Sequence, residues 1–316
     1  KDQNRSVYRF KRDCIENSLY GVDIDSGAVE IAKLRLWLSL VVDEDDIRSI
    51  KPLPNLDYRI ICGDSLLGFP LTPSLGSEIE KLKQQFLIET RVSEKEKLKS
   101  EINQKINFLL SESERHLGRS ISMDIRVNFS EIFHEKQGFD IVIGNPPYIQ
   151  LQTDKGRVGN NYQIMKYSTF AKTGDIYCLF YERAYNILSD RGIGVYITSN
   201  KWMKAAYGKK LRAFLRGNVQ PLSLIDVGPG LFEAATVDTN ILFFNNGASG
   251  CPFQGCRLDR IPDSGLFEYV HRNGVEISVN DVGDKWEIAS PEDQRLARKM
   301  ETIGVSLKNW NIKINF

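Results

Sequence analysis

Much of what would place this 316-residue chain in a specialised class is absent from it. No apolar run reaches about 18 residues and no signal-peptide pattern is present, so no membrane span is expected. The five cysteines are scattered, and the close pair Cys251 and Cys256 lacks the second pair or nearby histidine that completes a zinc site. We therefore expect no metal ion and a reducing, cytoplasmic environment.

An excess of charge of one sign is also absent. The net charge is +1, so contact with a nucleic acid would have to come from a local basic patch. No G-x-G-x-x-G pattern follows an expected strand, which argues against a nicotinamide-dependent dehydrogenase. Hydrophobic residues make up 41% and charged residues 26%, which is typical of a globular chain with one large α/β domain and part of another.

The first half of the chain alternates short apolar runs with amphipathic stretches. The apolar runs predict strands at residues 18–24, 58–62, 139–143, 192–198, 222–227 and 239–244. The amphipathic stretches predict three helices. The first is capped by Asp25 or Ser26 and ends near Leu40, and the other two span residues 176–188 and 202–215. This alternation predicts an α/β fold with a doubly wound, mostly parallel sheet.

Two stretches interrupt that alternation. Residues of about 70–137 form an insertion dense in Glu and Lys, and its apolar spacing predicts a helical hairpin, either simply solvated or an arm that docks DNA or a partner. After a loop-like stretch that begins at residue 247, the pattern predicts strands at 267–270, 275–279 and 286–288 and a helix at 291–303. We place the first domain at residues 1–246 and a linker with the start of a second domain at 247–316.

The most informative motif is Asn145-Pro146-Pro147-Tyr148, which directly follows the apolar run at residues 139–143. That run predicts a fully buried parallel strand, and ligands of open α/β sheets bind where such strands end. Proline fixes its own backbone, lacks an N–H and makes the residue before it extended, so the turn is stiff and rich in acceptors. The Asn145 side-chain oxygen and the Pro146 carbonyl suit a ligand with two N–H donors, and Tyr148 offers a flat face. The motif therefore predicts a site for an amino group on an aromatic ring or an amide.

Carboxylates end two earlier strands. Asp23 follows the strand of residues 18–24, beside Ile24, and it could hydrogen-bond both hydroxyls of a ribose. Asp64, followed by Ser65, ends the next strand. Either acid could instead be a helix cap or a surface group, and Asp25 is the expected cap of the helix that follows the first strand. Taken in order with Asn145, however, these acids form a stronger signal than any one of them alone.

Together these motifs resemble those of gamma-class N6-adenine DNA methyltransferases of the Type IIG (Eco57I-like) restriction–modification family. The resemblance implies a Rossmann-like methyltransferase core, S-adenosylmethionine as cofactor and double-stranded DNA as partner. It implies methyl transfer to the exocyclic N6 of a flipped-out adenine, with catalytic roles for Asn145, Pro146 and Tyr148. It also implies a cofactor site made by Asp23, Ile24, Asp64, Ser65, Asn145 and Pro147.

Other segments resemble the DNA side of that family's site. Residues 174–180 resemble the segment beside the target base, although an ordinary core helix would have the same pattern. Within residues 228–237, Phe232 is the candidate to stack on the extruded base, or alternatively packs on the sheet. The stretch 200–218 holds six cations and no acid, and phosphate contact by Lys201, Lys204, Lys209 and Lys210 is as plausible as a merely solvated face.

The family's glycine-rich cofactor loop does not occur in residues 1–18, and we expect it upstream of Lys1. Residues 307–314 resemble the opening of the family's target-recognition domain. No Glu-x-Lys pattern indicates a nuclease site in this chain, so any endonuclease activity would lie elsewhere in the protein.

Other functions stay open at this stage. Methyltransferases for protein glutamine and for RNA guanine carry the same tetrapeptide, although the long insertion and the residues after 246 disfavour them. A non-catalytic DNA-specificity fragment is the remaining alternative.

Overall fold

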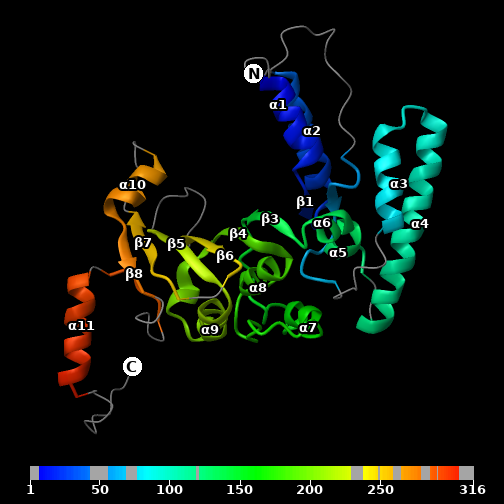
Figure 1. Cartoon of the computed structure of the whole chain (residues 1–316). Helices are drawn as coiled ribbons and strands as arrows, with labels where there is room; N and C mark the ends of the chain where they lie inside the picture. Colours follow the sequence, from blue (N-terminus) through cyan, green and yellow to red (C-terminus); the bar gives the residue numbers. More distant parts are fainter. Residues whose placement is uncertain are drawn as a thin grey trace. The chain divides into compact units, whose positions relative to one another are not determined.

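The computed structural model describes residues 7–42, 56–68, 77–118, 121–228, 238–247, 250–258, 265–278, 285–289 and 291–305. The chain divides into two units, Lys1–Gln137 and Gly138–Phe316 (Figure 1). Among the described helices, none combines the length and the apolar character that a membrane crossing requires.

The first unit contains a two-stranded parallel sheet of β1 (Gly21–Asp23) and β2 (Ile60–Cys62). Helices α1 (Val7–Asn17) and α2 (Ser26–Val41) pack with it around a small core that includes Tyr8, Val29 and Ile60. Asp25 caps α2, as the sequence predicts, because its carboxylate accepts the backbone N–H of Ala28 at 2.8 Å.

The helical hairpin predicted in the insertion is confirmed by α3 (Ser77–Ile88) and α4 (Val92–Leu117), which run side by side in Figure 1. The short helices α5 (Ile125–Asn128) and α6 (Ser130–Glu135) follow it. Asp57 ties the hairpin to the strands, since its carboxylate contacts Lys99 of α4 at 2.8 Å and Lys33 of α2 at 3.5 Å. The insertion is thus anchored on the first unit by specific ion pairs.

The second unit is built on a six-stranded sheet in the order β3-β4-β6-β5-β7-β8. Its strands are β3 (Phe139–Gly144), β4 (Leu188–Ser199), β5 (Gln220–Val227), β6 (Thr239–Asn245), β7 (Phe253–Leu258) and β8 (Val275–Ile277). The pairs β3–β4 and β5–β7 are parallel, whereas β4–β6, β5–β6 and β7–β8 are antiparallel. The α/β prediction is therefore confirmed, but the sheet is mixed and not mostly parallel, because β6 lies reversed between β4 and β5.

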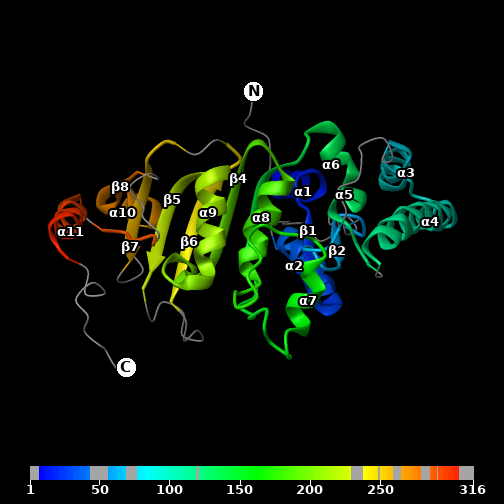
Figure 2. The ribbon, with the colours of Figure 1, turned by 90° about the horizontal axis from the view of Figure 1, so that it is seen from below.

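Helices cover both faces of this sheet. Figures 1 and 2 show α8 (Tyr177–Ile187) and α9 (Lys209–Asn218) on one face, over a core that includes Tyr196, Leu224 and Phe244. On the other face α10 (Leu266–Asn273) packs against Ile225 and Val227 of β5. Alternate residues of β5 thus serve opposite layers, as the two-residue period of a strand requires.

The helix predicted at 202–215 is only partly present. The chain forms two short 3-10 helices, η3 (Asn200–Met203) and η4 (Ala206–Gly208), before α9 begins. The buried guanidinium of Arg212 donates hydrogen bonds to the backbone carbonyls of Trp202 and Ala205. Those carbonyls are satisfied without a continuous helix, which explains the interruption.

The C-terminal predictions are mixed. Helix α11 (Pro291–Ile303) and the strand β8 are confirmed, but residues 267–270 lie in α10 and residues 286–288 are not a strand. Trp286 is fully buried against Trp202, with ring centroids 5.3 Å apart. Strands β7 and β8 continue the same sheet as β5, and the domain boundary near residue 246 stays a prediction.

Candidate functional site

The motif Asn145-Pro146-Pro147-Tyr148 directly follows β3. Within the second unit β3 lies at an end of the six-stranded sheet, and Ile141 and Ile143 are 62% and 76% exposed. The prediction that the strand before the motif is fully buried is therefore wrong within this unit. Strand β3 is an edge strand of the described sheet and pairs there with β4.

Asn145 stands at the carboxyl end of β3, and its side chain is exposed. In the described part of this unit no hydrogen bond to its side chain is found, so its amide oxygen remains available as an acceptor. The residue before it must be small, because a Cβ on Gly144 would lie 2.9 Å from the ring of Tyr196. Pro146 is buried and Pro147 is exposed, and each proline fixes its own backbone φ and lacks an N–H.

The ring of Tyr148 is 36% exposed and packs edge-to-face on Tyr177, with centroids 5.9 Å apart and planes at 80°. Tyr177 is fully buried, and its hydroxyl lies 2.7 Å from that of Tyr207. Burial raises the pKa of Tyr148 and, more strongly, that of Tyr177. Both phenols are therefore neutral near pH 7, and the Tyr148 side chain remains partly accessible to solvent.

Backbone hydrogen bonds pin the chain that follows the motif to the start of α8. Gln150 and Asp175 form an isolated antiparallel bridge, in which Ile176 N–H donates to the Ile149 carbonyl at 2.9 Å. The N–H of Leu151 donates to the Gly174 carbonyl at 2.8 Å. The segment 174–180, predicted to lie beside the target base, is thus held directly against the motif.

In the first unit, the acids Asp23 and Asp64 lie at the carboxyl ends of neighbouring parallel strands. The Asp23 carbonyl accepts the N–H of Gly63 at 2.8 Å, which brings the two strand ends together. The Asp23 carboxylate also accepts the N–H of Asp25, and that of Asp64 accepts the N–H of Leu66. Ile24, beside Asp23, is 72% exposed. The predicted cofactor acids of this unit are therefore adjacent, with an apolar side chain next to them.

The four predicted phosphate-binding lysines share one segment, but they differ in their partners. Lys204 pairs with Glu287 at 3.1 Å, and Lys210 donates to the Phe170 carbonyl at 2.8 Å. For Lys201 and Lys209 no side-chain partner is found among the described residues, and both are exposed.

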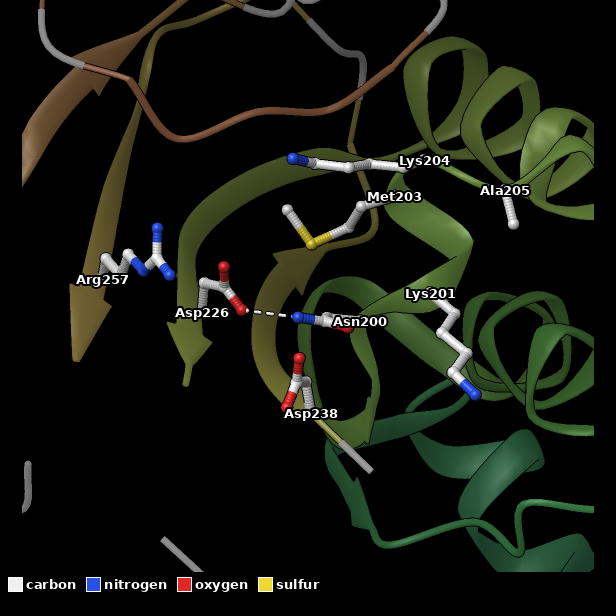
Figure 3. A pocket seen from close by; sticks show the side chains of 8 residues that line it. All are labelled: Asn200, Lys201, Met203, Lys204, Ala205, Asp226, Asp238 and Arg257. Atoms are coloured by element: carbon white, nitrogen blue, oxygen red, sulfur yellow. Dashed lines mark hydrogen bonds between the residues drawn. The ribbon is translucent and has the colours of Figure 1, made fainter. Parts of the chain in front are cut away.

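This segment opens on a pocket of about 420 Å³ at the carboxyl ends of β4, β5 and β7 (Figure 3). At its centre the Asn200 amide donates to Asp226 at 2.9 Å, with Arg257 on one side and Lys201 on the other. Because β3, β4, β5 and β7 point the same way, this pocket and Asn145 occupy the same edge of the sheet.

Two predictions lie outside the described residues: Phe232 as the stacking aromatic, and residues 307–314 as the opening of a further domain. Sequence reasoning missed the pairing of Tyr207 with Tyr177 and of Asn200 with Asp226. No local pattern signals either pair, since 30 and 26 residues separate their members.

Comparison with known proteins identifies the family. The sequence profile of the Eco57I restriction-modification methylase family matches residues 17–232, which include the two acidic strand ends, the tetrapeptide and the basic segment. The chain belongs to the Eco57I restriction-modification methylase family.

Individual relatives agree with this assignment. The chain is 28% identical to the type II restriction enzyme and methyltransferase RM.Eco57I of Escherichia coli over 244 residues, or 75% of this chain and 20% of that protein. It is 25% identical over 117 residues to the adenine-specific methyltransferase BrxX of Escherichia coli O9:H4 (strain HS), or 36% of this chain and 10% of that protein. The matched part of this chain thus spans a fifth or less of these relatives.

A solved structure shares the fold. The ATP-dependent Type ISP restriction-modification enzyme LlaBIII bound to DNA superimposes with a TM-score of 0.52 and 12% identity, over 90% of this chain and 18% of that one.

Proposed function

We propose that this chain is part of the catalytic core of a site-specific DNA methyltransferase that acts on the exocyclic N6 of adenine in double-stranded DNA. The observation that carries the proposal is the exposed acceptor of Asn145 at a strand end, beside a half-exposed aromatic ring. Family membership supports the reaction class, and similarity to the adenine-specific methyltransferase BrxX supports adenine as the target.

The residues of this chain would promote the reaction by orienting the adenine amino group. The adenine amino nitrogen is a poor nucleophile because its lone pair is delocalised into the ring. The Asn145 side-chain oxygen and the Pro146 carbonyl would each accept one of its N–H groups, which aims the lone pair out of the ring plane. A strong general base is not needed, because the nitrogen becomes acidic only once the new bond forms.

Adenine inside a duplex cannot reach a turn of this kind, so the base must be flipped out at a cost of about a few kcal/mol. Stacking on the partly exposed ring of Tyr148 would recover part of that cost. Phosphate contacts by Lys201 and Lys209, whose ammonium groups have no described partner, would hold the backbone beside the site. Stacking by Phe232 belongs to the same proposal.

The residues of the first unit fit the adenosine part of S-adenosylmethionine, which supplies the methyl group when it is bound. Two carboxylates at neighbouring strand ends offer acceptors for ribose hydroxyls and for an adenine amino group, and the exposed Ile24 offers an apolar contact. We assign Asp23 to the ribose and Asp64, with Ser65, to the adenine. Pro147, exposed in the second unit, is assigned to the cofactor by resemblance alone.

The test is transfer of labelled methyl groups from S-adenosylmethionine to unmethylated genomic DNA by the full natural protein. We expect N6-methyladenine, identified by mass spectrometry of the digested DNA. Asn145→Ala should lower the rate by about 100-fold or more, because it removes a preorganised acceptor. Asn273→Ala is the matched control, since Asn273 lies on α10 and bonds only its own helix.

Each other outcome has a defined meaning. Label in protein or RNA would favour the glutamine or guanine methyltransferases. Binding of DNA without any transfer would favour a non-catalytic specificity role. Equal activity of Asn145→Ala and Asn273→Ala would refute the proposed site.

A further inference from the structure

The hydroxyl pair of Tyr177 and Tyr207 links the motif tyrosine to the basic segment. Tyr148 precedes the segment of residues 149–176, which contains the short helix α7 (Arg157–Gln163). Tyr177 begins α8, and Tyr207 lies on η4. Tyr148 contacts Tyr177 through its ring at 5.9 Å, and Tyr177 reaches Tyr207 through its hydroxyl at 2.7 Å. Three segments that are distant in the sequence therefore meet in a single chain of contacts.

Asp175 interacts with the same group of tyrosines. Burial raises the pKa of Tyr207, and the carboxylate of Asp175 raises it further. The Tyr207 phenol therefore stays protonated beside the Asp175 carboxylate, and a hydrogen bond of 2.7 Å joins its hydroxyl to that of Tyr177. Asp175 is itself largely buried, and its backbone bridges Gln150 just beyond the motif. Asp175 is thus linked both to the hydroxyl pair and to the segment that directly follows Tyr148.

The location of Tyr207 suggests a purpose for the contacts that join Tyr148, Tyr177 and Tyr207. In the sequence Tyr207 lies between Lys201 and Lys209, the two lysines assigned to phosphate contact. A Cβ on Gly174, just before α8, would lie 3.5 Å from the Tyr207 ring. A movement of the basic segment on DNA would be transmitted to Tyr177 through the hydroxyl pair. A buried hydroxyl that loses its partner is costly, so the pair resists separation.

We infer that Tyr207 is a positioning residue, which fixes the ring of Tyr148 through Tyr177 so that the ring is ready for a flipped base. The inference rests on the proposed function, because it assigns a role within the same site. The role assigned to Tyr207 requires no contact of its own with the base or the cofactor. Its effect should therefore depend entirely on the presence of the Tyr148 ring.

The experiment is a double-mutant cycle in the full natural protein, with Tyr207→Phe, Tyr148→Ala and the double variant. Tyr207→Phe removes one hydroxyl and keeps the ring. We expect it to lower kcat for DNA methylation about tenfold, the scale of one lost buried hydrogen bond, with the KM for S-adenosylmethionine unchanged. In the Tyr148→Ala background the same substitution should have no further effect.

Tyr185→Phe is the matched control, because it also removes a hydroxyl from a half-buried tyrosine, and its ring packs on Phe214 at 5.5 Å, away from the motif. It should keep the activity of the unmodified protein. Thermal unfolding of every variant separates a loss of positioning from a loss of folded protein.

A second measurement uses a duplex with 2-aminopurine at the methylated position, once that position is mapped by sequencing. Tyr207→Phe should weaken the quenching of the flipped 2-aminopurine by an ordered Tyr148. The positioning role is overturned if Tyr207→Phe is as active as Tyr185→Phe, or if it causes the same loss in the Tyr148→Ala background. If the unmodified protein does not methylate adenine at all, it is the proposed function that fails.

Discussion

At the scale of single residues, the ion pairs and hydrogen bonds in the structure distinguish lysines that the sequence alone presents as equivalent. The stretch 200–218 carries six cations, but the ammonium of Lys204 already faces Glu287 and that of Lys210 already caps the Phe170 carbonyl. Lys201 and Lys209 are exposed, and neither has a side-chain partner among the described residues. Only a lysine that is not already neutralised gains fully from a phosphate, so these two should contribute most to DNA binding.

This difference predicts the salt dependence of DNA binding. Lys201→Gln and Lys209→Gln should each reduce the slope of log K against log salt concentration by about 1, uniformly across DNA sequences. Lys204→Gln should reduce it less, because Glu287 competes for that charge. Fluorescence anisotropy with a labelled duplex at several salt concentrations measures all three. A slope that does not change in Lys201→Gln and Lys209→Gln would assign phosphate binding to other cations.

Local patterns predicted those residues whose role is set by their immediate neighbours. Asp25 caps α2, and Asn145 ends β3, because strand ends and helix starts are encoded within a few residues. The partners of Tyr207 and Asp226 could not be predicted, because they depend on which strands become neighbours in the sheet. The same holds for Gly63, where a Cβ would lie 2.4 Å from Met123.

At the scale of elements, short apolar runs proved ambiguous. The pattern of residues 267–270 predicts a strand, but they lie in α10, in which Leu266, Tyr269 and Val270 face β5 and β7 at helical spacing. The segment around Trp286 also reads as a strand. Instead the backbone N–H of Trp286 donates to the Met203 carbonyl at 2.9 Å, and the indole ring packs in the core against Trp202 and Phe253.

Trp286 should therefore be a structural part of the unit that carries the tetrapeptide. Trp286→Ala empties a fully buried site and should lower the free energy of unfolding by about 3–5 kcal/mol. Phe267→Ala, at an aromatic residue that is 85% exposed on α10, should change it by no more than about 0.5 kcal/mol. Urea unfolding monitored by circular dichroism gives both values. Equal stability of the two variants would show that Trp286 is not packed in this core.

At the scale of the whole molecule, the sequence orders the motifs but does not specify the strand directions. A mostly parallel sheet was predicted because strands and helices alternate up to residue 244. Strands β5 and β6 pair antiparallel, and only residues 228–238 lie between them, which is short for the crossover of about a dozen or more residues that a parallel pair needs. Strand composition alone cannot specify that direction.

The final prediction concerns where the sheet-bearing unit ends. A chain that stops at residue 246 loses β7, which pairs with β5 along residues 223–227, together with the core residues Phe253, Ile277 and Trp286. Leu224 and Ile225 would then be uncovered, and an exposed apolar edge favours aggregation. We expect the chain ending at residue 246 to be insoluble or to unfold without cooperativity, whereas the chain ending at residue 289 unfolds in one cooperative transition. Calorimetry and size-exclusion chromatography compare them. If both chains unfold alike, the residues after 246 form a separate domain and the boundary near 246 is correct.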